Sequence, residues 1–258
     1  MIVLCLVFAT LAQIASNFAN EYFDYKSGLD RPGREGPRRG VTEGDITPAA
    51  MKRATFVTLG MACIIGLSLI YWGGWIILLF GVIIAFGVLA YSAGPFPLSR
   101  HCLGEVAVIC YFGLAPVCLT YYLVAGNVDT YVWAGGIAIG LMGANVLLVN
   151  NIRDINDDRS VGKHTLASTL GRGTASFLFF INGWMAVWLM GSVWLWIGGP
   201  WLAVPSAYAI LHTLLWYRVD TLSRKAIEDP AMGRRLNPCL GMTAMLMALY
   251  AVLFAIAA

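Results

Sequence analysis

The chain has 258 residues, of which 59% are hydrophobic and only 12% are charged, and its formal net charge is +3. A soluble domain of this length carries about twice that share of charged residues, so the composition excludes an ordinary soluble fold. The basic residues lie in the connections between apolar segments, which argues against a nucleic-acid partner. The composition therefore indicates a membrane protein.

Eight apolar runs follow one another along the chain, each near or above the ~18 residues that a membrane-spanning helix needs. They predict an all-α fold, a polytopic transmembrane helical bundle of about eight spans around a central cavity, embedded in the lipid bilayer. We expect a single domain over residues 1–258. The runs cover residues 1–22, 54–71, 75–91, 106–124, 131–149, 177–196, 201–216 and 240–257.

The positions of the basic residues predict which loops share a side of the membrane. When the loops are assigned alternately to the two sides, all 17 Lys and Arg residues fall on one side, in segments 24–53, 94–105, 151–173 and 217–237. The short turns on the other side contain none. Because positively charged loops stay in the cytoplasm, we expect an integral protein of the cytoplasmic (inner) membrane. Its charged loops and active site should face the cytoplasm.

The first apolar run becomes polar toward its end. Gln13, Asn17, Asn20 and Asp24 follow one another at steps of four, three and four residues, which places them on one face of a helix. Polar groups at membrane depth are costly and usually face the protein interior or a wet cavity. A helix end just after this row would let Asp30 fold back toward Asp24.

The fifth run ends in a second polar motif. Asn150, Asp154 and Asp158 are spaced by four residues each, so on a continuous helix they span about 12 Å along one side. Two carboxylates one turn apart can share a divalent cation. Mg²⁺ suits such a site because it binds few carboxylates and takes phosphate oxygens at its remaining positions.

Two facing acidic motifs favour a diphosphate substrate whose charge is neutralised by bound metal ions. Nearby basic side chains can contact the phosphate oxygens directly. A long isoprenoid tail would explain the membrane setting, because it needs an apolar groove between helices. A single acidic cluster at a helix end is usually a solvated face, whereas two clusters, each following a long apolar span, indicate a site.

Four stretches of this sequence resemble signature motifs of the UbiA superfamily of intramembrane prenyltransferases, and most closely its MenA-type branch. Together they follow the family's order and spacing over essentially the whole chain. The resemblance implies transfer of a polyprenyl group from its diphosphate to an aromatic acid, 1,4-dihydroxy-2-naphthoate, in menaquinone synthesis. The stretches are residues 20–30, 36–40, 91–105 and 150–166.

The two motifs and the resemblance together predict the site residues. We expect Asp24, Asp154 and Asp158 to be catalytic, and the same three residues with Asp30 to bind Mg²⁺, the expected cofactor. The residues expected to contact the diphosphate or the acceptor are Asn20, Lys26, Arg39, Tyr91, Asn150, Arg153 and Lys163.

Some alternatives stay open at this point. Other members of the superfamily act on 4-hydroxybenzoate, homogentisate, a chlorophyllide or haem, and a membrane transporter can use similar carboxylates for coupling. The family fold has nine helices and this sequence begins within what resembles the second, so we expect a further helix upstream. No obligate protein partner is evident.

Overall fold

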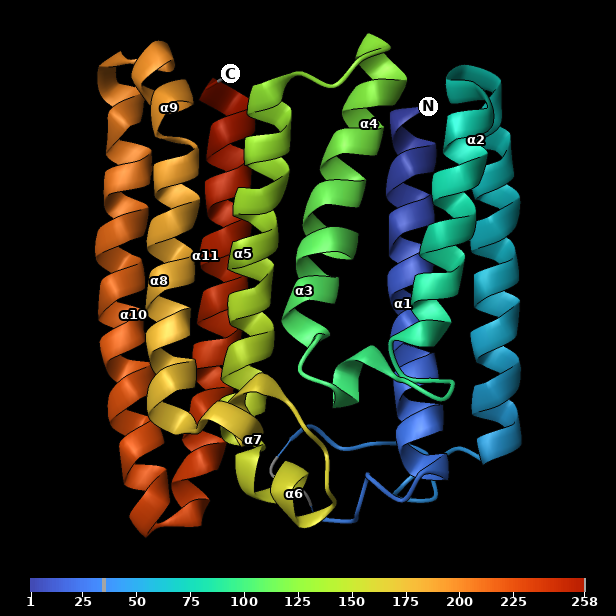
Figure 1. Ribbon diagram of the computed structural model, residues 1–258, viewed down its shortest axis with the longest axis vertical. Coiled ribbons are helices and arrows are strands. Elements are labelled where there is room, and N and C mark those ends of the chain that lie inside the picture. The colour runs from blue at the N-terminus through green and yellow to red at the C-terminus, as the bar shows by residue number, and fades with distance from the viewer. Residues whose placement is uncertain (34–35, 258) are drawn as a thin grey trace.

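The computed structural model describes residues 1–33 and 36–257, and within these ranges its regular elements are helical (Figure 1). The prediction of an all-α fold is confirmed. The elements are α1 (Ile2–Lys26), α2 (Pro48–Ala90), η1 (Leu98–Arg100), α3 (Gly104–Val108), η2 (Ile109–Leu114), α4 (Ala115–Ala125), α5 (Thr130–Arg153), α6 (Ile155–Ser160), α7 (Leu166–Leu170), α8 (Arg172–Leu189), α9 (Gly191–Ile197), η3 (Gly199–Leu202), α10 (Ala203–Glu228), η4 (Pro230–Leu236) and α11 (Asn237–Ala257).

Each of the predicted apolar runs is helical, but two of them share one element. The second and third runs both lie in α2, which reverses direction at Gly74, where φ is 61° and ψ is −157°. Glycine suits this turn because a side chain disfavours positive φ. Figure 1 shows α2 as two antiparallel arms joined at the upper end of the bundle.

The long apolar helices make this an integral membrane protein. Within the described part of the chain, five helices are long and apolar enough to cross a membrane, or six if α8 and α9, bent by 44°, form one span. This count is lower than the predicted eight because α2 contains two of the runs. In addition, α10 carries several charged residues in its second half.

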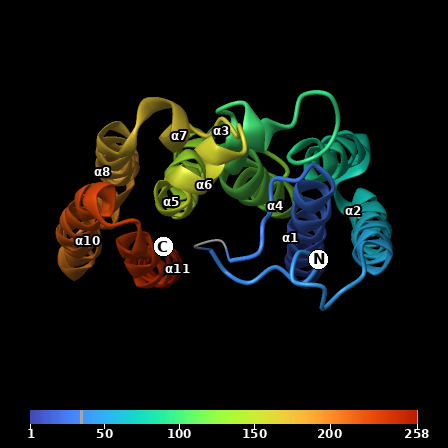
Figure 2. The same ribbon diagram turned by 90° about the horizontal axis from the view of Figure 1, so that it is seen from below.

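The charged loops gather at one end of the bundle. Figure 1 places both termini at the upper end and places α6, α7 and the connection between α1 and α2 at the lower end. Seen from below, α1 and α2 lie on one side and α8, α10 and α11 on the other, with α3, α4 and α5 between them (Figure 2). The side of the membrane on which this lower end lies stays a prediction.

Helix α5 packs closely against the helix formed by α3, η2 and α4. A Cβ atom at Gly113 in η2 would lie 2.3 Å from the Gly136 carbonyl oxygen and 2.5 Å from Gly140 Cα, both on α5. The α5 backbone therefore leaves no space for a side chain at position 113. η2 is a π-helical stretch, a feature common beside functional sites, and its residues line the cavity described below.

Gly113→Ala should destabilise the protein strongly, because the added methyl group meets backbone atoms that no side-chain rotation can move away. We expect a loss of at least the ~1–3 kcal/mol typical of overpacking. Thermal unfolding in detergent measures it. Gly60→Ala is the control, since a Cβ atom there has nothing within 4 Å. Equal melting temperatures for the two variants would contradict the close packing.

Candidate active site

A cavity of about 1350 Å³ lies between α1, α2, the α3–α4 helix, α5 and α11. This volume exceeds the ~300–1000 Å³ of common small-molecule pockets. Apolar side chains line most of the wall, and polar and charged side chains gather toward the lower end of the bundle. The apolar part includes Phe8, Leu69, Ile77, Leu119 and Met247.

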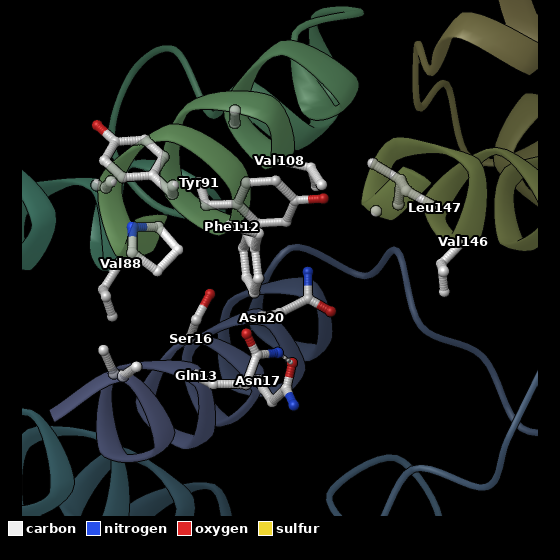
Figure 3. Close-up of a pocket in the computed structure, with 18 of the residues that line it drawn as sticks. Gln13, Ser16, Asn17, Asn20, Val88, Tyr91, Val108, Phe112, Val146 and Leu147 are labelled. Carbon is white, nitrogen blue, oxygen red and sulfur yellow. Dashed lines mark hydrogen bonds between the residues drawn. The ribbon is translucent and has the colours of Figure 1, made fainter. Parts of the chain in front are cut away.

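The polar face predicted for the first helix does line this cavity. Figure 3 shows Gln13, Asn17 and Asn20 pointing from α1 into the pocket, where Gln13 Nε2 donates a hydrogen bond to Asn17 Oδ1 at 3.1 Å. Tyr91 and Phe112 lie across the pocket from them. The cavity therefore has a polar edge along one apolar helix.

At the lower end of α1, the first motif forms a bonded group around a buried carboxylate. Asp24 is only 1% exposed, and Asn20 Nδ2 donates to its Oδ2 at 3.2 Å. Arg100 Nη2 donates to the other carboxylate oxygen, Oδ1, at 3.2 Å. Arg39 Nη2 donates to Asn20 Oδ1 at 2.9 Å. The motif therefore joins two loops to the end of α1.

The chain folds back after α1, as the sequence predicts for Asp30. The backbone N–H groups of Leu29 and Asp30 donate to the Asp24 carbonyl at 2.9 and 3.4 Å. The Asp30 carboxylate lies 3.5 Å from Arg39 Nε. Asp30 is thus held beside the first motif, and Arg39 links its carboxylate to Asn20.

The second motif is not one continuous helix. Helix α5 ends at Arg153, and α6 begins after Asp154, whose φ and ψ are −85° and 7°. Arg153 is only 2% exposed and donates from Nε to Asp154 Oδ1 at 2.6 Å and from Nη2 to Oδ2 at 2.8 Å. It also bonds Asn150 and, at 2.8 Å, Asn237 at the start of α11. The break between α5 and α6 therefore lies beside the buried Arg153.

One ammonium group brings the two motifs together. Lys163 Nζ lies 3.8 Å from Asp24 Oδ2 and 3.8 Å from Asp158 Oδ1. Thr165 Oγ1 donates to Asp158 Oδ2 at 3.3 Å and so holds the second carboxylate in place. Lys163 and Thr165 line the cavity, whereas Asp24 and Asp158 are not among the described residues that line it. Carboxylates far apart in the sequence therefore flank the same positive charge.

The structure brings most of the predicted site residues to this cavity. Asp24 and Asp158 each lie beside Lys163, which lines the cavity, and Asp30 lies next to Arg39. Lys26 is exposed at the end of α1 and is not among the described residues that line the cavity. The predicted residues that line it are Asn20, Arg39, Tyr91, Asn150, Arg153, Asp154 and Lys163.

The carboxylates of the described residues fit Mg²⁺ only if water and substrate phosphate oxygens supply the other ligands. Among the described residues, no group of three His, Cys, Asp or Glu side chains is close enough to hold a metal ion by itself. Mg²⁺ commonly takes one or two carboxylates and completes its shell with water and substrate phosphates. Asp24 and Asp158 already flank a cation, Lys163 Nζ, so the charge environment suits such an ion.

Three contributors were not predicted from the sequence. Arg100 is the one Lys or Arg of the 94–105 loop, and its pairing with Asp24 joins that loop to α1. Asn237 accepts from Arg153 across the bundle. Glu105 lines the cavity and accepts a hydrogen bond from Asn151. A lone basic residue facing acidic motifs was a signal for Arg100, whereas Asn237 carries no local signal.

Tyr91 follows the end of α2 and lines the cavity. Burial, followed by the negative charges of Glu105, Asp24 and Asp158, raises the pKa of Tyr91 well above its usual value. A tyrosine hydroxyl is protonated at neutral pH even without such a shift, so Tyr91 is able to donate a hydrogen bond in the cavity.

Arg153→Met should destabilise the protein by about 3–5 kcal/mol, because it removes the buried partner of Asp154. Arg224→Met is a matched control: Arg224 also lies 2.6 Å from a carboxylate, that of Asp220, but its side chain is 73% exposed. Exposed ion pairs contribute little. Chemical or thermal unfolding compares the two variants, and equal losses of stability would contradict the role of the buried pair.

Comparison with known proteins places these features in a family. The chain is 37% identical over 198 residues to a 1,4-dihydroxy-2-naphthoate octaprenyltransferase of Escherichia coli (strain K12), a match that covers 74% of this chain and 62% of that protein. It is 32% identical over 257 residues to the protein of the same name from Mycobacterium leprae (strain TN), covering 96% of this chain and 81% of the relative. The chain thus spans about three fifths of the Escherichia coli relative.

A solved structure has a similar fold. It comes from a study titled "Structural and mechanistic insights into the biosynthesis of Digeranylgeranylglyceryl phosphate synthase in membranes", and it matches with a TM-score of 0.52 at 17% identity. The match covers 99% of this chain and 84% of that one. The sequence profile described as "UbiA prenyltransferase family" matches residues 1–237. The chain therefore belongs to the UbiA prenyltransferase family.

Proposed function

We propose that this protein transfers a polyprenyl group from polyprenyl diphosphate to 1,4-dihydroxy-2-naphthoate in menaquinone biosynthesis, with Mg²⁺ as cofactor. The observation that carries the proposal is the meeting of Asp24 and Asp158 around Lys163 at the polar end of a long apolar cavity. The names of the relatives point to the acceptor. The proposal assigns Asp24, Asp154 and Asp158 as the catalytic residues.

The two ends of the cavity match the two parts of a polyprenyl diphosphate. The apolar wall, with side chains such as Phe8, Leu69 and Met247, suits the isoprenoid tail. At the other end, Arg39, Arg153 and Lys163 present guanidinium and ammonium groups that match phosphate oxygens. The tail would therefore lie along the bundle, with its diphosphate at the lower end.

Charge compensation governs the chemical step in this proposal. Mg²⁺ bound by Asp24 and Asp158, with Asp30 and Asp154 nearby, would neutralise the diphosphate as the allylic C–O bond breaks. Lys163, which lines the cavity, would contact a diphosphate oxygen, and Arg153 would keep the Asp154 carboxylate in position. Asn20 and Asn150 would orient these groups through their amide oxygens.

The acceptor would react beside the aromatic wall. Tyr91 and Phe112 face the polar edge of α1 (Figure 3), and their rings can stabilise an allylic cation electrostatically. The electron-rich ring of the acceptor would form the new C–C bond with this cation, and its carboxyl group would leave as CO₂. The apolar surroundings would keep water from the cation.

The charge pattern also gives the proposed orientation. Because basic loops stay in the cytoplasm, we propose that the lower end of the bundle, with the site, faces the cytoplasm in the inner membrane. Both substrates would then enter from the cytoplasm or from the membrane interior.

A transfer assay tests the proposal directly. Membranes or purified protein are incubated with labelled polyprenyl diphosphate, Mg²⁺ and 1,4-dihydroxy-2-naphthoate, with 4-hydroxybenzoate and homogentisate as alternative acceptors. We expect prenylated 1,4-dihydroxynaphthalene, CO₂ and diphosphate, and no product when EDTA is present. Transfer to another acceptor alone would contradict the naphthoate assignment. Uptake of a substrate without any turnover would contradict the enzyme and favour a transporter.

Asp154→Asn and Asp158→Asn should each lower turnover by at least 100-fold, because each removes a carboxylate from the site. Asp158→Asn should leave the protein folded, whereas Asp154→Asn should also lower the melting temperature, because it leaves the buried Arg153 without its ion-pair partner. The same assay and a melting curve in detergent check both effects. Asp129→Asn is the control, since Asp129 lies at the start of α5, at the opposite end of the bundle. Normal turnover in both site variants would remove them from the catalytic set.

A further inference from the structure

One buried carboxylate of the cavity wall lies outside the charged cluster. Glu105, in the first turn of α3, is only 5% exposed and lines the cavity. Asn151 Nδ2 donates to Glu105 Oε1 at 2.9 Å. A carboxylate accepts about four hydrogen bonds. Glu105 therefore retains capacity for a ligand.

The Glu105 carboxylate lacks an ion pair with any described residue, unlike the aspartates of the two motifs. Asp24, Asp154 and Asp158 each have a Lys or Arg nitrogen within 4 Å, whereas Glu105 makes no ion pair with any residue that the structure describes. A carboxylate buried without a cation costs free energy unless hydrogen-bond donors compensate for it. A donor group of a bound ligand would supply that compensation.

The surroundings of Glu105 place it at the level where the acceptor would bind. A Cβ atom at the preceding Gly104 would lie 3.6 Å from the Tyr91 hydroxyl and 3.1 Å from Leu147 Cδ2, so the wall is tightly packed here. Asn151 follows Asn150 on α5, which faces the charged cluster through Arg153. Glu105 thus lies between the aromatic wall and the polar end of the cavity.

We propose that Glu105 binds the aromatic acceptor by accepting a hydrogen bond from a ring hydroxyl group, with Asn151 holding the carboxylate in position. This inference rests on the proposed function and names the residue that selects a hydroxylated ring. The negative charge of Glu105 also repels the carboxylate of the acceptor, so the ring should present a hydroxyl group to Glu105 and not its carboxylate. A hydrogen bond from its hydroxyl to a carboxylate also makes the ring richer in electrons.

The test measures acceptor binding separately from turnover. Binding of 1,4-dihydroxy-2-naphthoate and of its methyl ethers is titrated by fluorescence with the wild type, Glu105→Gln, Glu105→Asp and the exposed control Glu43→Gln. We expect Glu105→Gln to weaken naphthoate binding by about 10- to 100-fold, the effect of losing a hydrogen bond to a charged group. The wild type should bind one of the methyl ethers about 10- to 100-fold more weakly than it binds the naphthoate. Glu105→Gln should bind that ether and the naphthoate with similar affinity.

Two further readouts separate recognition from folding. In transfer assays the KM for the acceptor should rise in Glu105→Gln while the KM for polyprenyl diphosphate stays within about twofold, and Glu105→Asp should restore part of the acceptor affinity. Unchanged acceptor binding by Glu105→Gln, equal weakening for both substrates, or no naphthoate binding by the wild type would overturn the inference. Normal Glu105-dependent binding without any prenyl transfer would support it and overturn the proposed function instead.

Discussion

The candidate site depends on one constraint, the balance of charge at the buried end of the cavity. Asp24 and Asp158 come from opposite parts of the bundle, and their carboxylates would repel each other if no cation lay between them. Lys163 Nζ lies 3.8 Å from both and so holds the two motifs together. Arg100 places a second cation beside Asp24, and Arg153 pairs with Asp154. The same arrangement would attract a diphosphate once a divalent cation neutralised the acids.

The rest of the bundle positions this cluster. The tight contact of Gly113 with α5 fixes the central helix whose end carries Asn150 and Arg153. The hairpin at Gly74 returns the chain so that Tyr91 reaches the cavity beside α1. These two features give a cavity whose wall is apolar and whose lower end is charged. Such a cavity separates the tail of an amphipathic substrate from its headgroup.

The sequence predicts the fold better than it predicts the contacts of the site. Long apolar runs report membrane helices directly, and the spacing of Asn17, Asn20 and Asp24 reports a helix face, so both are readable from local pattern. The pairing of Arg100 with Asp24 joins residues 76 positions apart and depends on tertiary packing. The helix break at Asp154 also has no signal in the local sequence, and it lies where the buried Arg153 bonds Asp154. Lys26 follows the motif in sequence, yet it lies exposed.

The central claim is that the two acidic motifs act on one ligand. A double-mutant cycle tests it through the binding of an unreactive thiodiphosphate analogue of a prenyl diphosphate, measured with Mg²⁺ for the wild type, Asp24→Asn, Asp158→Asn and the double variant. If the carboxylates share the cation that grips the ligand, the double variant should bind hardly more weakly than either single variant. Additive losses of binding free energy would mean two independent sites and would contradict the account.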